Sequence, residues 1–180
     1  NVRTPRDNFY NTLVNSAHQF FVHRNGEDYV LAGYPWFKCR ARDMFISLPG
    51  LTLTNNEIKK FDDVMVTAEK AIRHFMAGEP LGVSVTEIEH PDVLLWTVWC
   101  LQQYADTQGV EACMQKYGGL VGDIMRWLMD GKHPNLEIRP NGLVYSEGRD
   151  RAVTWMNSTD QGGKPIVPRT GYIVEFNALW

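Results

Sequence analysis

The sequence predicts an all-α fold, because apolar residues recur at helical spacing in successive segments through its first two-thirds. After Pro134 the pattern changes, and short apolar runs flank an Asn-Gly pair that is typical of a β-hairpin turn. With 44% hydrophobic content, 180 residues are enough to bury the core of one domain. We therefore expect a single helical domain over residues 1–180 with one small β-hairpin.

The first two predicted helices cover residues 6–22 and a segment that ends at Gly78. Asp7 suits the first turn of the first helix, and Asn55 or Asn56 is placed to cap the second. Gly78 follows the last periodic residue, where a glycine commonly ends a helix. The apolar stripe of the second helix consists of Ile58, Phe61, Met65, Ala68, Ile72, Phe75 and Met76.

Two further helices are predicted to pack beside each other. The third begins at Pro91 and Asp92 and is apolar on nearly every side, which indicates burial. The fourth runs from about Val110 to Asp130 with one broad apolar face and ends at Gly131. An inner and an outer helix of a toroid would show these patterns, and so would two helices of a plain bundle.

The C-terminal third is predicted to consist of a hairpin, a loop and a short helix. Asn141-Gly142 lies between the two apolar runs and favours a tight turn, since both residues tolerate positive φ. The Gly- and Pro-rich segment 158–170 is expected to form a surface loop near the functional site. A short helix is expected from about Tyr172.

Composition excludes several classes of function. A net charge of −3 without a basic run argues against a nucleic-acid partner and suits a neutral ligand such as a glucan. The five histidines show no metal-ligand spacing, so we expect neither a metal site nor a cofactor.

The cellular setting is predicted from two further features. No apolar run approaches the roughly 20 residues that cross a bilayer, so we expect no membrane partner. Three cysteines without ligand-like spacing fit reduced thiols, and we expect a cytoplasmic location.

Residues 32–51 contain a candidate sugar pocket. Arg42 and Asp43 can hydrogen-bond adjacent hydroxyls, and the preceding aromatic residues Tyr34, Trp36 and Phe37 offer apolar faces. The alternative is that Arg42 and Asp43 only form surface or interior ion pairs within the fold.

Five motifs give the chain a family resemblance. Residues 41–47 (ARDMFIS) match G-R-D-T-F-I-S, and residues 154–157 (TWMN) match T-W-M-D. Residues 165–169 (PIVPR) match P-x-x-P-R, residues 174–180 (VEFNALW) match V-E-x-x-A-L-W, and residues 91–96 give a weaker match. From about Leu31 onward the chain thus resembles the amylo-alpha-1,6-glucosidase domain of glycogen debranching enzymes.

The resemblance implies a fold and an activity. It implies part of an (α/α)6 toroid of the six-hairpin glycosidase type, and inverting hydrolysis of alpha-1,6-linked glucose at trimmed branch points of glycogen or another branched α-glucan. Because residues 178–180 lie inside a motif, we expect a truncated piece that holds the first half of the barrel. Such a piece alone is expected to be inactive and to self-associate through exposed inner helices.

The resemblance also assigns roles on the acid side of the reaction. It places the general acid at Asn157, whose amide cannot donate a proton to the leaving oxygen. Three explanations of Asn157 remain open. The protein is a relative that binds without hydrolysis, the residue is an engineered knock-out, or another carboxyl group serves as the acid. Glu175 is then a better substitute than Asp160, unless Glu175 pairs with Arg169 or Lys164.

The remaining candidates are expected to contact the sugar. The resemblance implies that Arg42 and Asp43 hold the terminal glucose, while Cys39-Arg40-Ala41 departs from the Trp-Gly pair that precedes them in the family. Trp36 would replace the missing aromatic face, or lie in the core. The other residues expected to contact the sugar are Asp92, Trp96, Lys164 and Arg169. Alternatively, the charge of Asp92 only stabilises a helix N-terminus. The alternative for Lys164 and Arg169 is that they hold the loop closed.

Two other classes of function compete with the enzyme. A non-catalytic glucan-binding relative or scaffolding module is favoured by Asn157. A helical protein-interaction domain would explain the periodicity and leave the motifs in the loops unexplained.

Overall fold

The computed structural model describes residues 5, 7–34 and 36–180. About half of the chain is helical, and the strands in the described residues are short and form only two-stranded sheets, which confirms the all-α class. The fold therefore suits a fragment of the toroid type. The chain divides into two compact units, 1–87 and 88–180. The expectation of one domain over residues 1–180 stays a prediction.

Unit 1 combines helices with two small sheets. Its elements in chain order are α1 (Phe9–His18), β1 (Phe21–Arg24), β2 (Glu27–Val30), β3 (Cys39–Arg40), α2 (Ala41–Thr52), the 3₁₀ helix η1 (Leu53–Asn55), α3 (Ile58–Ala77) and β4 (Val85–Thr86). Strands β1 and β2 are antiparallel, whereas β3 and β4 are parallel. Helix α3 contacts α2, β2 and β4, so it forms the centre of this unit.

The first predicted helix is too long, since α1 ends at His18 and the residues up to Val22 include the start of β1. Asn25 and Gly26 both have positive φ, 56° and 75°, and form a two-residue turn that pairs β1 with β2. The N-terminal cap is Asn8, whose side chain accepts a hydrogen bond from a backbone N–H of the first turn, so Asp7 lies before the first turn and not in it. Arg6, the predicted start, lies outside the described residues.

The boundaries of α3 confirm one prediction and correct another. Gly78 ends the helix in the left-handed conformation with a φ of 72°, as expected. The N-terminal cap is Glu57, which makes no side-chain cap bond, whereas Asn56 lies in the left-handed region that closes η1. Four members of the predicted stripe are buried, namely Phe61, Met65, Ala68 and Ile72.

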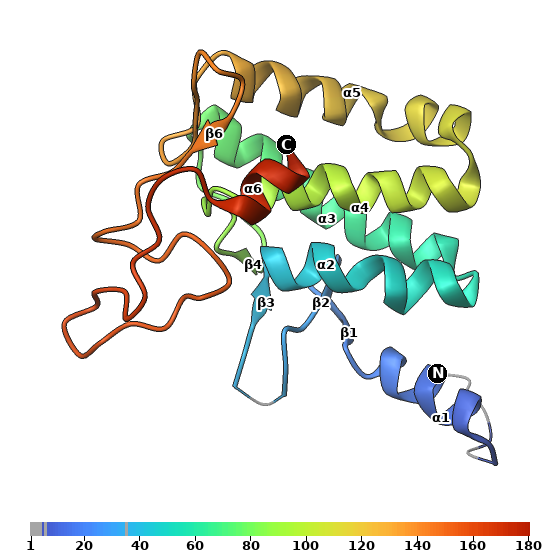
Figure 1. The fold of residues 1–180 in the computed structure, drawn as a ribbon. Coiled ribbons are helices and arrows are strands. Elements are labelled where there is room, and N and C mark those ends of the chain that lie inside the picture. The colour runs from blue at the N-terminus through green and yellow to red at the C-terminus, as the bar shows by residue number, and fades with distance from the viewer. Residues whose placement is uncertain (1–4, 6, 35) are drawn as a thin grey trace. The chain divides into compact units, whose positions relative to one another are not determined.

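Unit 2 is built on a helical hairpin. Its elements are α4 (Val93–Gln108), α5 (Val110–Met129), β5 (Glu137–Ile138), β6 (Val144–Tyr145) and α6 (Val174–Leu179). Helices α4 and α5 lie side by side, with the Tyr104 and Tyr117 rings 5.3 Å apart between centroids, so the predicted pairing is confirmed (Figure 1). Helix α6 also contacts α4 and begins two residues after Tyr172.

The predicted hairpin is present as β5 and β6, but its turn differs from the expected one. Gly142 has a φ of 81°, while Asn141 is outside the left-handed region. Gly142 donates its backbone N–H to the Arg139 carbonyl at 2.8 Å, so Pro140 lies inside the turn. The fixed φ of Pro140 suits the first central position of such a turn.

Candidate active site

Arg42 and Asp43 lie in the first turn of α2, directly after β3. Pairing of β3 with β4 fixes the backbone at Cys39 and Arg40, where the helix begins. The Arg42 side chain is buried, with 4% of the residue exposed, whereas Asp43 is exposed. Adjacent helical residues do not face each other, so these two side chains have different surroundings.

Asp43 lines a cavity of about 310 Å³ within unit 1. The other lining residues are mostly apolar: Phe20, Val30, Leu31, Ala32, Ile46, Ser47 and Leu51. One carboxylate in an apolar wall is a composition found in ligand pockets, and the volume is at the small end of their range. The arrangement offers a hydrogen-bond acceptor beside a surface that can cover apolar C–H groups.

The aromatic residues of segment 34–37 lie at the surface. Trp36 is 83% exposed, which excludes the alternative of a core tryptophan. Phe37 is covered on one face by the Arg40 guanidinium, 4.6 Å from the ring centroid. The Tyr34 hydroxyl donates to the backbone carbonyl of Gln19. Trp36 is not among the residues that line the Asp43 cavity.

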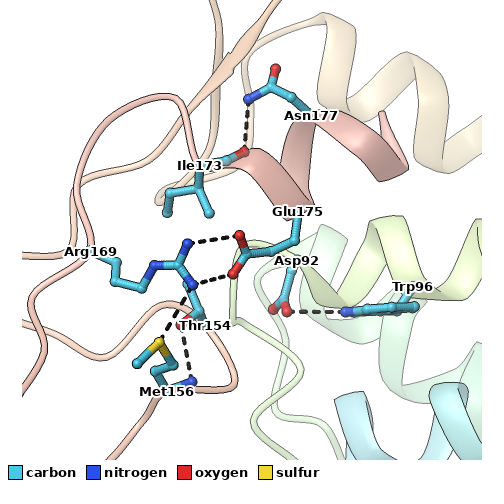
Figure 2. Close-up of polar contacts among 8 residues, drawn as sticks. All are labelled: Asp92, Trp96, Thr154, Met156, Arg169, Ile173, Glu175 and Asn177. Atoms are coloured by element: carbon cyan, nitrogen blue, oxygen red, sulfur yellow. Dashed lines mark hydrogen bonds and ion pairs between the residues drawn. The ribbon is translucent and has the colours of Figure 1, made fainter.

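In unit 2, Arg169 links two of the sequence motifs (Figure 2). Its guanidinium forms a bidentate ion pair with the Glu175 carboxylate, with 2.8 Å between Nη2 and Oε2. The same guanidinium contacts the Met156 sulfur at 3.7 Å. Of the two ion pairs left open by the sequence, the one with Arg169 is present. In this arrangement both Glu175 carboxylate oxygens accept hydrogen bonds from the arginine.

The loop between β6 and α6 is closed at its base. Ser146 and Gly171 exchange backbone hydrogen bonds of 3.1 and 2.9 Å. The Thr170 hydroxyl donates to a Glu147 carboxylate oxygen and accepts from the Gly148 backbone N–H. Hydrogen bonds from the Arg149 backbone and from Thr170 lower the pKa of Glu147. We call residues 147–170, which these contacts enclose, the closed loop.

Asn157 lies in the closed loop and is partly exposed. In the described residues, no hydrogen bond to its side chain is present. Thr154, which is almost fully buried, accepts a hydrogen bond from the Met156 N–H at 3.1 Å (Figure 2). Thr154 therefore fixes the backbone just before Asn157, and Arg169 holds the Met156 side chain.

Asp160 and Lys164 form a turn farther along the closed loop. The Asp160 carboxylate accepts the backbone N–H of Gly162 at 2.8 Å and that of Lys164 at 2.9 Å. These bonds give Asp160 a role in loop conformation. Lys164 itself is exposed.

Asp92 and Trp96 interact one turn apart at the start of α4. The Trp96 indole N–H donates to the Asp92 carboxylate at 3.2 Å, and Asp92 is 1% exposed (Figure 2). The Asp92 side chain makes no cap hydrogen bond to the helix. The Trp96 ring also meets Trp99 edge-on, at 5.4 Å between centroids. Both side chains are thus held by the helix itself.

The candidates form separate groups. Unit 1 brings Arg42 and Asp43 into one helical turn, and unit 2 joins Arg169 to Glu175 and Asp92 to Trp96. Among the described residues, no three His, Cys, Asp or Glu side chains form a group that could hold a metal ion. In the same part of the chain, no helix has the length and apolarity needed to cross a membrane.

Sequence reasoning did not find the contact of Arg169 with Met156 or the polar cavity beside the β5–β6 hairpin. The only sequence signal for that cavity is the group of polar residues directly after the predicted turn, among them Glu147 and Arg151.

Comparison with known proteins places both units in one family. Residues 15–180 match the family model described as Amylo-alpha-1,6-glucosidase, a glycosidase family. Searches of curated proteins and of solved structures gave no match. The matched range contains the motifs at residues 41–47, 154–157, 165–169 and 174–180. The chain belongs to the amylo-alpha-1,6-glucosidase family.

Proposed function

We propose that this chain is part of a glycoside hydrolase that removes alpha-1,6-linked glucose from trimmed branch points of glycogen or a related α-glucan. Hydrolysis proceeds with inversion at the anomeric carbon. The family match over residues 15–180 carries the proposal. The Asp43 cavity and the ordered segment before Asn157 support it, because a glycosidase needs a sugar pocket and a fixed acid position.

In unit 1, Asp43 accepts hydrogen bonds from hydroxyls of the terminal glucose while the apolar lining covers its C–H surface. Arg42 fixes the same sugar or the backbone around it. Trp36 has an exposed ring that can cover a sugar face.

In unit 2, Asn157 occupies the acid position, and Arg169 with Glu175 positions the segment that carries it. Inverting hydrolysis requires a protonated carboxyl group at the leaving oxygen. Glu175 can take that role only after its ion pair with Arg169 breaks. Lys164 is exposed and can donate to a sugar hydroxyl, while Asp92 orients Trp96.

A second candidate function is glucan binding without hydrolysis. Two observations favour it. The Asn157 amide cannot act as a general acid, and the Glu175 carboxylate forms an ion pair with Arg169. Such a protein would bind a branched maltooligosaccharide and release no glucose from it. Turnover therefore separates the two functions.

The sugar-holding role is tested by Asp43→Asn in the natural full-length protein. The substrate is a maltooligosaccharide that carries one alpha-1,6-linked glucose. Loss of a charged acceptor should lower kcat/KM for glucose release about 10- to 100-fold. Asp63→Asn is the matched control, since Asp63 pairs with Lys59 on the surface of α3. An unchanged rate in Asp43→Asn would remove Asp43 from the site.

A further inference from the structure

A second cavity, of about 450 Å³, lies within unit 2 beside the β5–β6 hairpin. It is lined by Gly131 and residues 133–137 after α5, and by Tyr145, Glu147 and Arg151. Most of its exposed lining is polar, in contrast to the apolar Asp43 cavity. Two of these residues, Glu147 and Arg151, belong to the closed loop, and none is among the candidate sugar or acid residues described above.

Hydrogen bonds hold the polar groups of this cavity in place. The Arg151 guanidinium donates to the Asn135 side-chain oxygen. The Ser146 hydroxyl donates to the Asn135 carbonyl at 2.7 Å, and the Asn135 amide group donates to the Glu89 carbonyl at 3.4 Å. Asn135 therefore connects Ser146, directly after β6, with Arg151 and the segment before α4. A preorganised lining loses little entropy when a ligand binds.

The charges of the lining favour a neutral ligand. Glu147 is ionised, since hydrogen bonds lower its pKa, and Glu137 pairs with Arg139 at 3.1 Å. Burial lowers the pKa of His133 to about 4, so the ring is neutral at pH 7. Carboxylates repel an anion, and the Arg151 guanidinium disfavours a cation. A polyhydroxyl compound can use both the acceptors and the donor.

Tyr145 is the aromatic residue in the cavity lining, and neighbouring side chains fix the orientation of its ring. The Arg139 guanidinium lies 4.5 Å from the Tyr145 ring centroid. The Tyr172 ring meets it edge-on, at 5.6 Å and 83°. Sugar rings present C–H groups that pack on aromatic surfaces while their hydroxyls bind charged groups. The combination of Tyr145, Glu147 and Arg151 therefore suits a sugar better than an apolar compound.

We propose that this cavity is a second glucan-binding site, which takes glucose units of an alpha-1,4-linked chain. The proposal rests on the proposed function, because a debranching enzyme must hold the chain that carries the branch. Glu147 accepts and Arg151 donates hydrogen bonds to sugar hydroxyls, and Tyr145 contacts the sugar ring. The site lies within residues 131–151 and needs no residue of unit 1.

The test uses the natural full-length protein with maltoheptaose as the probe. Hydrogen exchange should slow at the amides of residues 133–151 when maltoheptaose is added. Arg151→Ala and Glu147→Gln should each weaken maltoheptaose binding about tenfold in calorimetry, because each removes a charge-assisted hydrogen bond. Arg126→Ala is the control, since Arg126 pairs with Asp123 on α5 and lies outside the cavity.

The outcomes separate this inference from the proposed function. Unchanged exchange at residues 133–151 together with unchanged affinity in Glu147→Gln would overturn the second site, even if the wild type still released glucose. Loss of affinity in Arg126→Ala as large as in Arg151→Ala would also contradict it. A wild type that neither binds maltoheptaose nor releases glucose would refute the second site and the proposed function together. If Arg151→Ala unfolds, Glu147→Gln and the exchange data decide.

Discussion

At the scale of single residues, Asn157 and Glu175 have different surroundings. The Glu175 carboxylate is bound by both terminal nitrogens of Arg169, and only about a quarter of each side chain is exposed. Asn157 lies in the loop that the same arginine helps to order. Asn157 is therefore the position where a carboxyl group could act as an acid without first breaking an ion pair.

This difference predicts the effect of Asn157→Asp in the natural full-length protein. A carboxyl group at the acid position should raise kcat for release of alpha-1,6-linked glucose by about 10²- to 10⁴-fold. The control is Asn141→Asp in the hairpin turn, where the new oxygen still accepts the Leu143 N–H. An unchanged kcat in Asn157→Asp would show that this residue is not at the acid position.

Residue types and motif positions predicted part of the candidate site. The sequence offered Arg169 and Lys164 as partners of Glu175, and their charges alone could not decide between them. The structure decides, because the Arg169 guanidinium pairs with Glu175 through both terminal nitrogens, whereas the described contacts of Glu175 do not include Lys164. Arg42 and Asp43 were likewise predicted to act together. The structure shows that the Arg42 side chain is buried and that Asp43 is exposed.

At the scale of elements, the closed loop is ordered by contacts at its two ends. Gly148 lies where the two ends of the closed loop meet. A Cβ atom at this position would lie 1.9 Å from the Arg169 carbonyl oxygen and 2.9 Å from the Val153 side chain. No flexible side chain can move to relieve the first contact, because it involves backbone. Gly148 therefore allows the two ends of the closed loop to approach each other.

We predict opposite effects for two Gly→Ala substitutions in unit 2. Gly148→Ala should destabilise the protein by about 1–3 kcal/mol, since the methyl group has no space. Gly119→Ala should stabilise it by about 0.5–1 kcal/mol, because Gly119 is exposed within α5 and nothing lies within 4 Å of the added Cβ. Differential scanning calorimetry should show a lower Tm for the first and a higher Tm for the second. Equal Tm values would contradict the tight base of the closed loop.

Most helices could be predicted from the sequence, whereas their ends could not. The stripe of α3 and the pairing of α4 with α5 follow from apolar periodicity, because the residues that a helix buries must lie on one face. The error at α1 came from extending that periodicity into residues 19–22, although Asn25-Gly26 signals a hairpin as clearly as Asn141-Gly142 does. Local turn geometry therefore overrides a short helical pattern.

At the scale of the whole molecule, the family match spans both units, and the motifs are distributed between them. Helical periodicity could not distinguish a toroid from a bundle, because both bury one face of each helix. The family resemblance supplied that distinction, and the helical composition of the structure agrees with it. Self-association through inner helices stays a prediction, which light scattering can test.

The proposed function is hydrolysis of an alpha-1,6-linked glucose with inversion. The most direct measurement is a proton NMR time course of the natural full-length protein with a maltooligosaccharide that carries one such glucose. Inversion predicts that the first free glucose appears as the β anomer and equilibrates later. Release of α-glucose first, or no release while the oligosaccharide binds, would contradict the proposed function.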